Sequence, residues 1–184
     1  MGENPMKDDY IIVLDFLSRG HADSRRAEPT VQGIGVNFLN LLEVILKDDA
    51  IVKPEDLLYI GEQKRDKVKF IKERIKYNDL TMFAKDELEI VIDKIIDQNQ
   101  ARFVNFFNVA GPVTTRLHTL ELLPGIGKKH MWAIIEGRRI KKFETFEDLK
   151  NRVEMLPDPK RMIKKRIIEE LKESDRHMLF VVSH

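Results

Sequence analysis

The chain has 184 residues, 42% of them hydrophobic and 34% charged, which fits one domain or two small ones with a hydrophobic core. The absence of cysteine excludes disulfides and thiolate metal sites, and a net charge of +1 means that any nucleic-acid-binding surface must come from an uneven distribution of charge. No apolar run approaches about 18 residues, so the sequence predicts no membrane span, no signal peptide and a cytoplasmic protein.

The first part of the chain has the composition of β-strands. Five segments rich in β-branched and aromatic residues are separated by polar or glycine-containing stretches. We expect strands at residues 10–17, 30–36, 38–46, 57–61 and 68–75. The third segment also fits a short helix, but a strand is favoured because the apolar run 44–46 follows a turn-like stretch. Five short strands within about 70 residues predict a small barrel or curled sheet over residues 8–77.

The rest of the chain has helical patterning. Apolar residues in the segment 79–99 recur at the spacing of an amphipathic helix, and a second, strongly apolar helix is expected over 101–108. Together these form a helical connector, residues 78–110. The aromatic residues expected in the core are Trp132, Phe103, Phe106 and Phe107.

Two further helices and a last strand are expected near the C-terminus. Thr145 and Asp148 have capping-box spacing before a short helix, and Asp158 can cap a helix that starts at Pro159. The apolar run 177–182 predicts a C-terminal strand. Because a lone strand is not stable, we expect the segment 175–184 to pair with the N-terminal sheet.

A glycine-containing turn lies between two predicted helices of the unit 116–138. Its sequence, residues 122–129, is Leu-Leu-Pro-Gly-Ile-Gly-Lys-Lys. Pro124 ends the first helix, while Gly125 and Gly127 allow unusual backbone dihedrals and let an anion approach the main chain. Ile126 can fill the space between the helices. The second helix starts at Lys128, so its free N–H groups and positive dipole end form an anion site.

This turn resembles the helix-hairpin-helix family, whose members bind the sugar-phosphate backbone without reading sequence. The resemblance places phosphate contacts on Gly125, Gly127, Lys128 and Lys129, and it allows a monovalent cation at the hairpin carbonyls as the sole cofactor. The family often pairs two hairpins. Residues 155–160 occupy the second position in the domain 111–174, but they lack both glycines. Asp158 would repel phosphate there unless it caps a helix, so this half is expected to be structural.

The charge distribution supports nucleic-acid binding. Residues 116–142 contain seven Lys and Arg against two Glu, and residues 64–76 contain seven against two acids, so each run carries +5. The intervening segment 79–97 carries −4. In a barrel of the oligonucleotide-binding type, the loop between strands 1 and 2 contacts the ligand, which draws attention to the loop 19–26. The predicted nucleic-acid-binding residues are Gly125, Ile126, Gly127, Lys128, Lys129, Arg116, Arg138, Arg139, Arg19, His21, Arg25 and Arg26.

As a whole, the chain resembles an uncharacterised archaeal family of predicted RNA-binding proteins. Those proteins join an N-terminal OB/S1-like β-barrel to a helix-hairpin-helix domain, so the resemblance implies an α+β fold. It also implies binding to RNA and no known reaction. We therefore expect a non-catalytic nucleic-acid-binding protein, with RNA favoured over DNA, that serves ribosome or tRNA metabolism. No membrane is expected as a partner, whereas a ribosomal or polymerase-associated protein is an open alternative.

Other functions fit parts of the sequence. The hairpin motif also occurs in DNA glycosylases, ligases and nucleases, and Asp148 has roughly the spacing of a glycosylase aspartate. The alternative that the acidic segment 79–97 and the predicted terminal strand 177–182 dock a ribosomal or polymerase component also stays open. His21, Asp23 and Ser24 hint at a hydrolytic triad, but neighbours in one loop lack the rigid scaffold of a triad. The five histidines show no zinc-ligand spacing, so neither a catalytic nor a metal residue is predicted.

Overall fold

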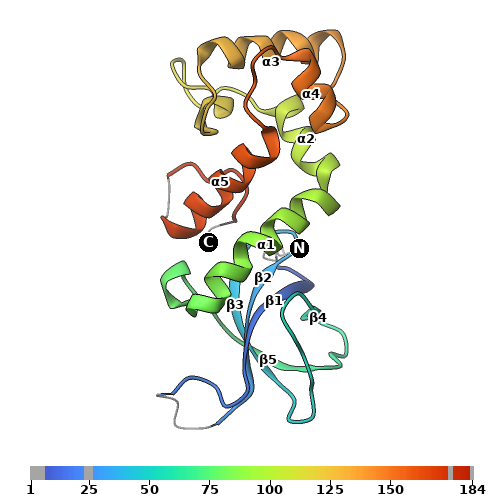
Figure 1. The fold of residues 1–184 in the computed structure, drawn as a ribbon, viewed down its shortest axis with the longest axis vertical. Coiled ribbons are helices and arrows are strands. Elements are labelled where there is room, and N and C mark those ends of the chain that lie inside the picture. Colours follow the sequence, from blue (N-terminus) through green and yellow to red (C-terminus); the bar gives the residue numbers. More distant parts are fainter. Residues whose placement is uncertain (1–6, 23–26, 174–175, 183–184) are drawn as a thin grey trace, which may run out of the picture. The chain divides into compact units, whose positions relative to one another are not determined.

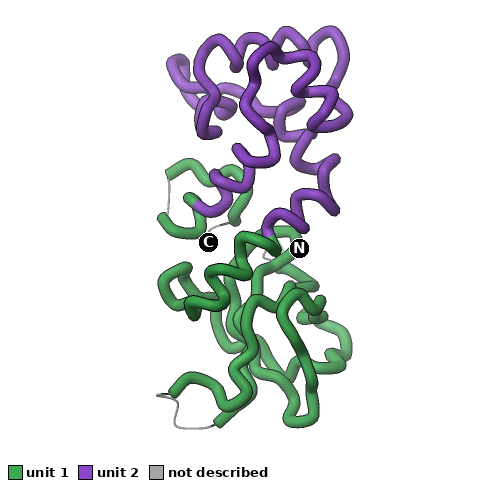
Figure 2. Tube along the Cα trace, in the orientation of Figure 1, with its two compact units in different colours: residues 1–91, 169–184 green, residues 92–168 purple. Residues whose placement is uncertain are grey.

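The computed structural model describes residues 7–22, 27–173 and 176–182. In this part of the chain the fold is α+β, with five antiparallel strands in a curled half-barrel followed by five α-helices (Figure 1). The chain divides into two compact units, residues 1–91 with 169–184 and residues 92–168 (Figure 2). We call them the half-barrel unit and the helical unit.

The half-barrel unit contains the strands β1 (Tyr10–Leu17), β2 (Thr30–Gly35), β3 (Leu41–Leu46), β4 (Leu57–Tyr59) and β5 (Val68–Arg74). Their order is β4-β1-β2-β3-β5, and every neighbouring pair is antiparallel. All five predicted strands are therefore present, and the third is a strand and not a helix. The two edge strands, β4 and β5, form no ladder with each other in the described residues.

Alternation along the strands builds the core of the half-barrel. Ile11 and Val13 of β1 are fully buried and pack with Val31, Val44 and Leu58. Glycine is required at position 33, where a Cβ would lie 2.9 Å from Ile11 Cδ1 and 3.0 Å from the Ile12 carbonyl oxygen. The close approach of β1 and β2 thus depends on that missing side chain.

The helices are α1 (Met82–Gln98), α2 (Gln100–Val109), α3 (Lys128–Ile140), α4 (Phe146–Arg152) and α5 (Pro159–Lys172), with 3₁₀ turns η1 (Tyr77–Asp79) and η2 (Thr119–Leu122). None of the described helices is both long and apolar enough to cross a bilayer. The stripe predicted for α1 is confirmed, since Leu88, Val91, Ile92, Ile95 and Ile96 are all buried.

Trp132 corrects one core prediction. Phe103 and Phe107 are buried as expected, but Trp132 is 55% exposed. Helix α3 buries Met131, Ile134 and Ile135, and position 132 lies on its other face.

The first helix of the predicted hairpin is also shorter than expected. Between Arg116 and Pro124, where a helix was expected, the structure has only the 3₁₀ turn η2. His118 caps this turn by accepting from the Leu120 amide, and Glu121 accepts from the His118 amide. This pair of contacts is a capping box, and it lies only a few residues before Pro124. Because proline does not fit inside a helix, there is room for one turn only.

The predicted C-terminal strand does not form in the described residues 176–182. The buried Glu170 of α5 accepts hydrogen bonds from the amides of Leu179, Phe180 and Val181, at 2.7, 3.0 and 2.9 Å. These amides are therefore unavailable to a strand ladder. Within the half-barrel unit, the Val182 amide donates to the Phe38 carbonyl.

Replacing Glu170 with Ala should leave these buried amides without an acceptor. We expect the free energy of unfolding to fall by about 2–4 kcal/mol, since each unsatisfied buried donor costs about 1–3 kcal/mol and water relieves part of it. Chemical denaturation measures the loss, and hydrogen exchange at residues 179–181 should accelerate. Glu169→Ala is the matched control, because Glu169 is exposed. Equal stability of the two variants would contradict the role given to Glu170.

Candidate functional site

The predicted hairpin forms a tight turn between η2 and α3. Gly125 has a φ of +92°, a region that side-chain-bearing residues rarely adopt, and a Cβ there would lie 3.3 Å from Pro157 Cγ. Ile126 is 7% exposed, so it fills the space under the turn as expected. Gly127 is the N-cap of α3, is extended, and has no atom within 4 Å of an added Cβ. The turn thus needs glycine at 125 for its conformation and has open space at 127.

The first turn of α3 presents backbone donors without a local acceptor. Gly127 has no side chain, and no other described side chain caps the helix. The amides of its first three residues, 128–130, therefore face the open space beside Gly127. Lys129 is exposed and makes no ion pair with a described residue. Lys128 is bound to Glu121 at 2.9 Å and to the Arg116 carbonyl at 3.2 Å, which holds its charge beside the turn.

The second, degenerate hairpin has a related geometry. Met155 has a φ of +55° and precedes the buried Leu156, as Gly125 precedes Ile126. Asp158 then caps α5, accepting from the Arg161 amide at 3.0 Å, as predicted. A carboxylate of the protein therefore accepts from a first-turn amide of α5, whereas no described side chain caps α3 and Glu121 binds the Lys128 side chain instead.

The three predicted arginines of this unit differ in environment. Arg116 and Arg139 are exposed. Arg138 instead donates to the carbonyls of Phe107 and Ala110 at 3.0 and 2.8 Å, which ties it to the C-terminal end of α2. Burial, with a smaller contribution from the charge of Arg139, lowers the pKa of Arg138. These two hydrogen bonds give the Arg138 guanidinium a structural role, which is to join α3 to α2.

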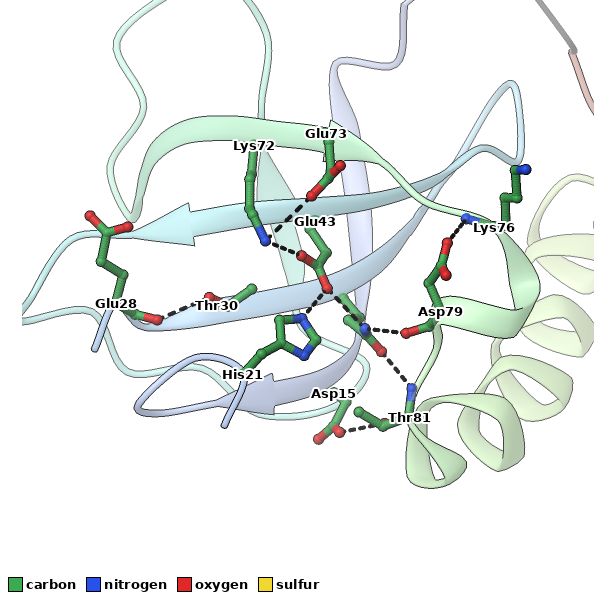
Figure 3. Close-up of polar contacts among 11 residues, drawn as sticks. Asp15, His21, Glu28, Thr30, Glu43, Lys72, Glu73, Lys76, Asp79 and Thr81 are labelled. Carbon is green, nitrogen blue, oxygen red and sulfur yellow. Dashed lines mark hydrogen bonds and ion pairs between the residues drawn. The ribbon is translucent and has the colours of Figure 1, made fainter. Parts of the chain in front are cut away.

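The predicted loop 19–26 belongs to the half-barrel unit. Arg19 is exposed, while Arg25 and Arg26 lie outside the described residues, as do Asp23 and Ser24. His21 Nε2 lies 2.5 Å from Glu43 Oε1, so its imidazole is held by the sheet (Figure 3). This anchors the start of the loop against β3.

Glu43 is the centre of a polar cluster that sequence reasoning missed. It is 2% exposed and also accepts from Lys72 at 2.8 Å and from Gln32 at 3.0 Å. Burial on its own would raise the pKa of Glu43, but the hydrogen bonds from Gln32, Lys72 and His21 outweigh it and hold the pKa below its usual value. The partners of Glu43 are 11 to 29 residues away along the chain, so no local pattern could have predicted the cluster.

The cluster continues to the start of α1. Gln32 accepts from the Thr81 amide at 2.9 Å and donates to the Asp79 carbonyl, and the Thr81 hydroxyl donates to Asp15 at 2.6 Å (Figure 3). In the described part of the chain no buried polar side-chain atom lacks a partner. These hydrogen bonds attach the start of α1 to the sheet. The carboxylate oxygens of Glu43 and Asp15 already accept hydrogen bonds in these contacts.

Several other acids considered in the sequence are engaged in structural contacts. Asp148 accepts from the Glu144 amide and pairs with Arg152, both at 3.1 Å, and these contacts lower its pKa. Asp93 and Asp97 of α1 each lie 2.7 Å from a lysine of α5. Among the described residues no group of three or more acids and histidines could hold a metal ion.

Comparison with known proteins identifies the family. The DUF655 family, described as a protein of unknown function, matches residues 7–182. The uncharacterized protein MJ0038 of Methanocaldococcus jannaschii is 46% identical over 176 residues, which are 95% of this chain and 80% of that protein. The crystal structure of Af1531 from Archaeoglobus fulgidus, of the same family, superposes with a TM-score of 0.86 at 45% identity and covers 95% of this chain and 100% of that one. The chain therefore belongs to the DUF655 family, and RNA binding stays a prediction.

Replacing Glu43 with Gln should make the free energy of unfolding depend less on pH in the acid range. Because the pKa of Glu43 is lowered by folding, its contribution is complete above its ordinary value near 4.5 and is lost as the pH falls through the folded value. We expect the variant to lose about 2 kcal/mol at neutral pH, and the difference to shrink below pH 4.5.

Denaturation of both proteins between acid and neutral pH measures this difference. Glu73→Gln is the matched control, since Glu73 is 55% exposed and also pairs with Lys72, at 3.4 Å. A loss of stability in Glu43→Gln that does not change with pH would contradict an ionised Glu43 in the folded protein.

Proposed function

We propose that this protein binds nucleic acid without catalysis, and that it holds a phosphate of the backbone at the hairpin 124–129. RNA is the favoured ligand. The observation that carries the proposal is the start of α3, where three backbone amides, Lys128 and Lys129 surround an open space at Gly127. A helix N-terminus of this kind binds phosphate through its N–H groups and its dipole.

The comparison within the molecule strengthens this proposal. Both hairpins place a positive-φ residue before a buried aliphatic side chain and then start a helix. At α5 the anion is supplied by Asp158, but at α3 an acceptor must come from outside the described protein, from water or from a ligand. The same geometry that Asp158 satisfies internally is what a phosphate oxygen would satisfy at α3.

The half-barrel unit supports the choice of nucleic acid. From its strand order, β4-β1-β2-β3-β5, we infer a five-stranded barrel of the OB type that is open between β4 and β5. The basic run 64–76 lies along the loop after β4 and along β5. Lys72 of this run is bound to Glu43, so the charge offered to a ligand comes from the remaining members.

The substitution Gly127→Asp should separate binding from stability. An Asp at the N-cap can accept from the α3 amides, so stability should be retained or rise by a few tenths of a kcal/mol. The same carboxylate repels phosphate and occupies its donors, and we expect affinity for RNA to fall at least tenfold. Fluorescence of Trp132, the one tryptophan of the chain, provides a readout beside the hairpin.

Gly127→Asn is the control for that experiment, since it can cap the helix without adding charge. It should weaken binding less than Gly127→Asp. If all three proteins bind RNA equally at low salt, the phosphate site is not at the start of α3.

A second prediction concerns salt. Lys129→Ala should weaken binding to all sequences alike and reduce the slope of log affinity against log salt by about 1, because one phosphate contact is lost. Titrations at several salt concentrations measure the slope. Glu136→Ala, which changes an exposed charge two turns further along α3, should leave affinity the same or slightly raise it. An unchanged slope in Lys129→Ala would contradict a phosphate contact at this residue.

A further inference from the structure

Three hollows of about 380, 720 and 400 Å³ adjoin one another on the half-barrel unit. The first and second share Tyr59 and Gln63, and the second and third share Asn40 and Arg74. Neighbouring hollows share wall residues, and we treat the three adjoining hollows together as one depression. It runs from the β1–β4 edge, past residues of both edge strands, to η1 and the end of α5.

Aromatic side chains line the depression along its length. The chain has three tyrosines, Tyr10, Tyr59 and Tyr77, and each lines at least one of the hollows. Tyr10 and Tyr59 are direct partners across the β1–β4 pair, with ring centroids 5.2 Å apart at 62°. By strand alternation they project from the face opposite to the buried Ile11 and Leu58.

Tyr10 is 43% exposed and lies on β1, the strand next to the edge strand β4. The neighbouring Leu57 is 59% exposed and lines the same hollow. At the other end, the ammonium groups of Lys172 and Lys85 lie 5.1 and 5.4 Å from the Tyr77 ring. Stacking surface therefore lies at Tyr10 and Tyr59, and cations lie along the whole depression, including beside Tyr77.

The charges that line the depression favour an anionic ligand. Seven lysines and arginines face five acids. Two of the acids are buried and bind backbone amides: Asp8 those of Asn37 and Phe38, and Glu170 those of the C-terminal segment. Exposed cations such as Lys64 and Lys76 outnumber the acids that remain. Basic walls interleaved with aromatic rings are the features by which proteins bind single strands, because unpaired bases can stack whereas paired bases cannot.

We propose that this depression binds a single-stranded segment of nucleic acid, with unpaired bases stacked on Tyr10 and Tyr59 and the backbone held by the basic residues between Tyr59 and Tyr77. The proposal rests on the proposed function for the class of ligand, but its residues are independent of the hairpin. It gives the half-barrel unit selectivity for unpaired bases, which the hairpin, as a backbone site, does not supply.

The test is binding of the full chain to a labelled single-stranded RNA of about 12 nucleotides and to a duplex of the same length, with Tyr10→Ala as the variant. Single-strand affinity should fall about tenfold, the size expected for the loss of one stacked base, and duplex affinity should not change. Phe83→Ala is the matched control, because Phe83 is a 53% exposed aromatic that lines none of the three hollows. Thermal denaturation verifies that each variant is folded.

A conservative variant adds a direct readout. In a Trp132→Phe background, Tyr10→Trp places the single tryptophan in the depression, where it should retain single-strand affinity and lose fluorescence when RNA binds. If Tyr10→Ala weakens binding no more than Phe83→Ala, or if the new tryptophan does not respond, the depression is not a single-strand site.

The two proposals fail separately. A loss of binding in Gly127→Asp but not in Tyr10→Ala would retain the hairpin site and overturn the depression. The reverse result would retain the depression and overturn the hairpin. No detectable binding of either RNA at low salt would overturn both.

Discussion

The hairpin depends on one buried side chain and one backbone conformation. Ile126 is buried in the core of the helical unit. Its side chain can reach that core because Gly125 adopts a φ of +92°. These two constraints turn the chain so that Gly127 starts α3 with its amides facing open space. The proposed function is argued from that geometry, because a helix start whose amides lack a capping side chain attracts anions. Glu121 lies near this helix start but is bound to the Lys128 ammonium. Lys128 and Lys129 then add charge without closing the space.

Buried carboxylates organise the half-barrel unit in a comparable way. Glu43 joins β3 to the start of the 19–26 loop and, through Gln32, to the start of α1. Asp8 and Glu170 accept backbone amides of irregular segments that no ladder satisfies. Each acid is costly to bury alone and is stable only with its full set of donors. These contacts tie the described segments 37–38 and 179–181 to the unit beside the depression.

The sequence predicted what depends on local pattern. Strand alternation, the stripe on α1 and the cap at Asp158 were all recognised because each is a property of neighbouring residues. The Glu43 cluster joins residues far apart in the chain, so no local pattern indicates it. Glu170 lies only 9 to 11 residues before the amides that it binds. The apolar run 177–182 has the composition of a strand and does not indicate that a side chain accepts from its amides, so the C-terminal strand was predicted wrongly. Trp132 was misplaced because hydrophobicity alone does not tell which face of α3 is buried. Tyr10 and Tyr59 became a pair only when the β1–β4 register was known.

The most direct measurement of the central claim is the shift of backbone amide resonances when RNA is added to the full chain. Phosphate binding at the hairpin predicts that the amides of residues 128–130 shift most in the helical unit. The amides at the start of α5, including that of Arg161, which is already bound to Asp158, should shift little. Large shifts at α5 with none at residues 128–130, or no shift at either helix under conditions where RNA binds, would contradict a phosphate site at the hairpin.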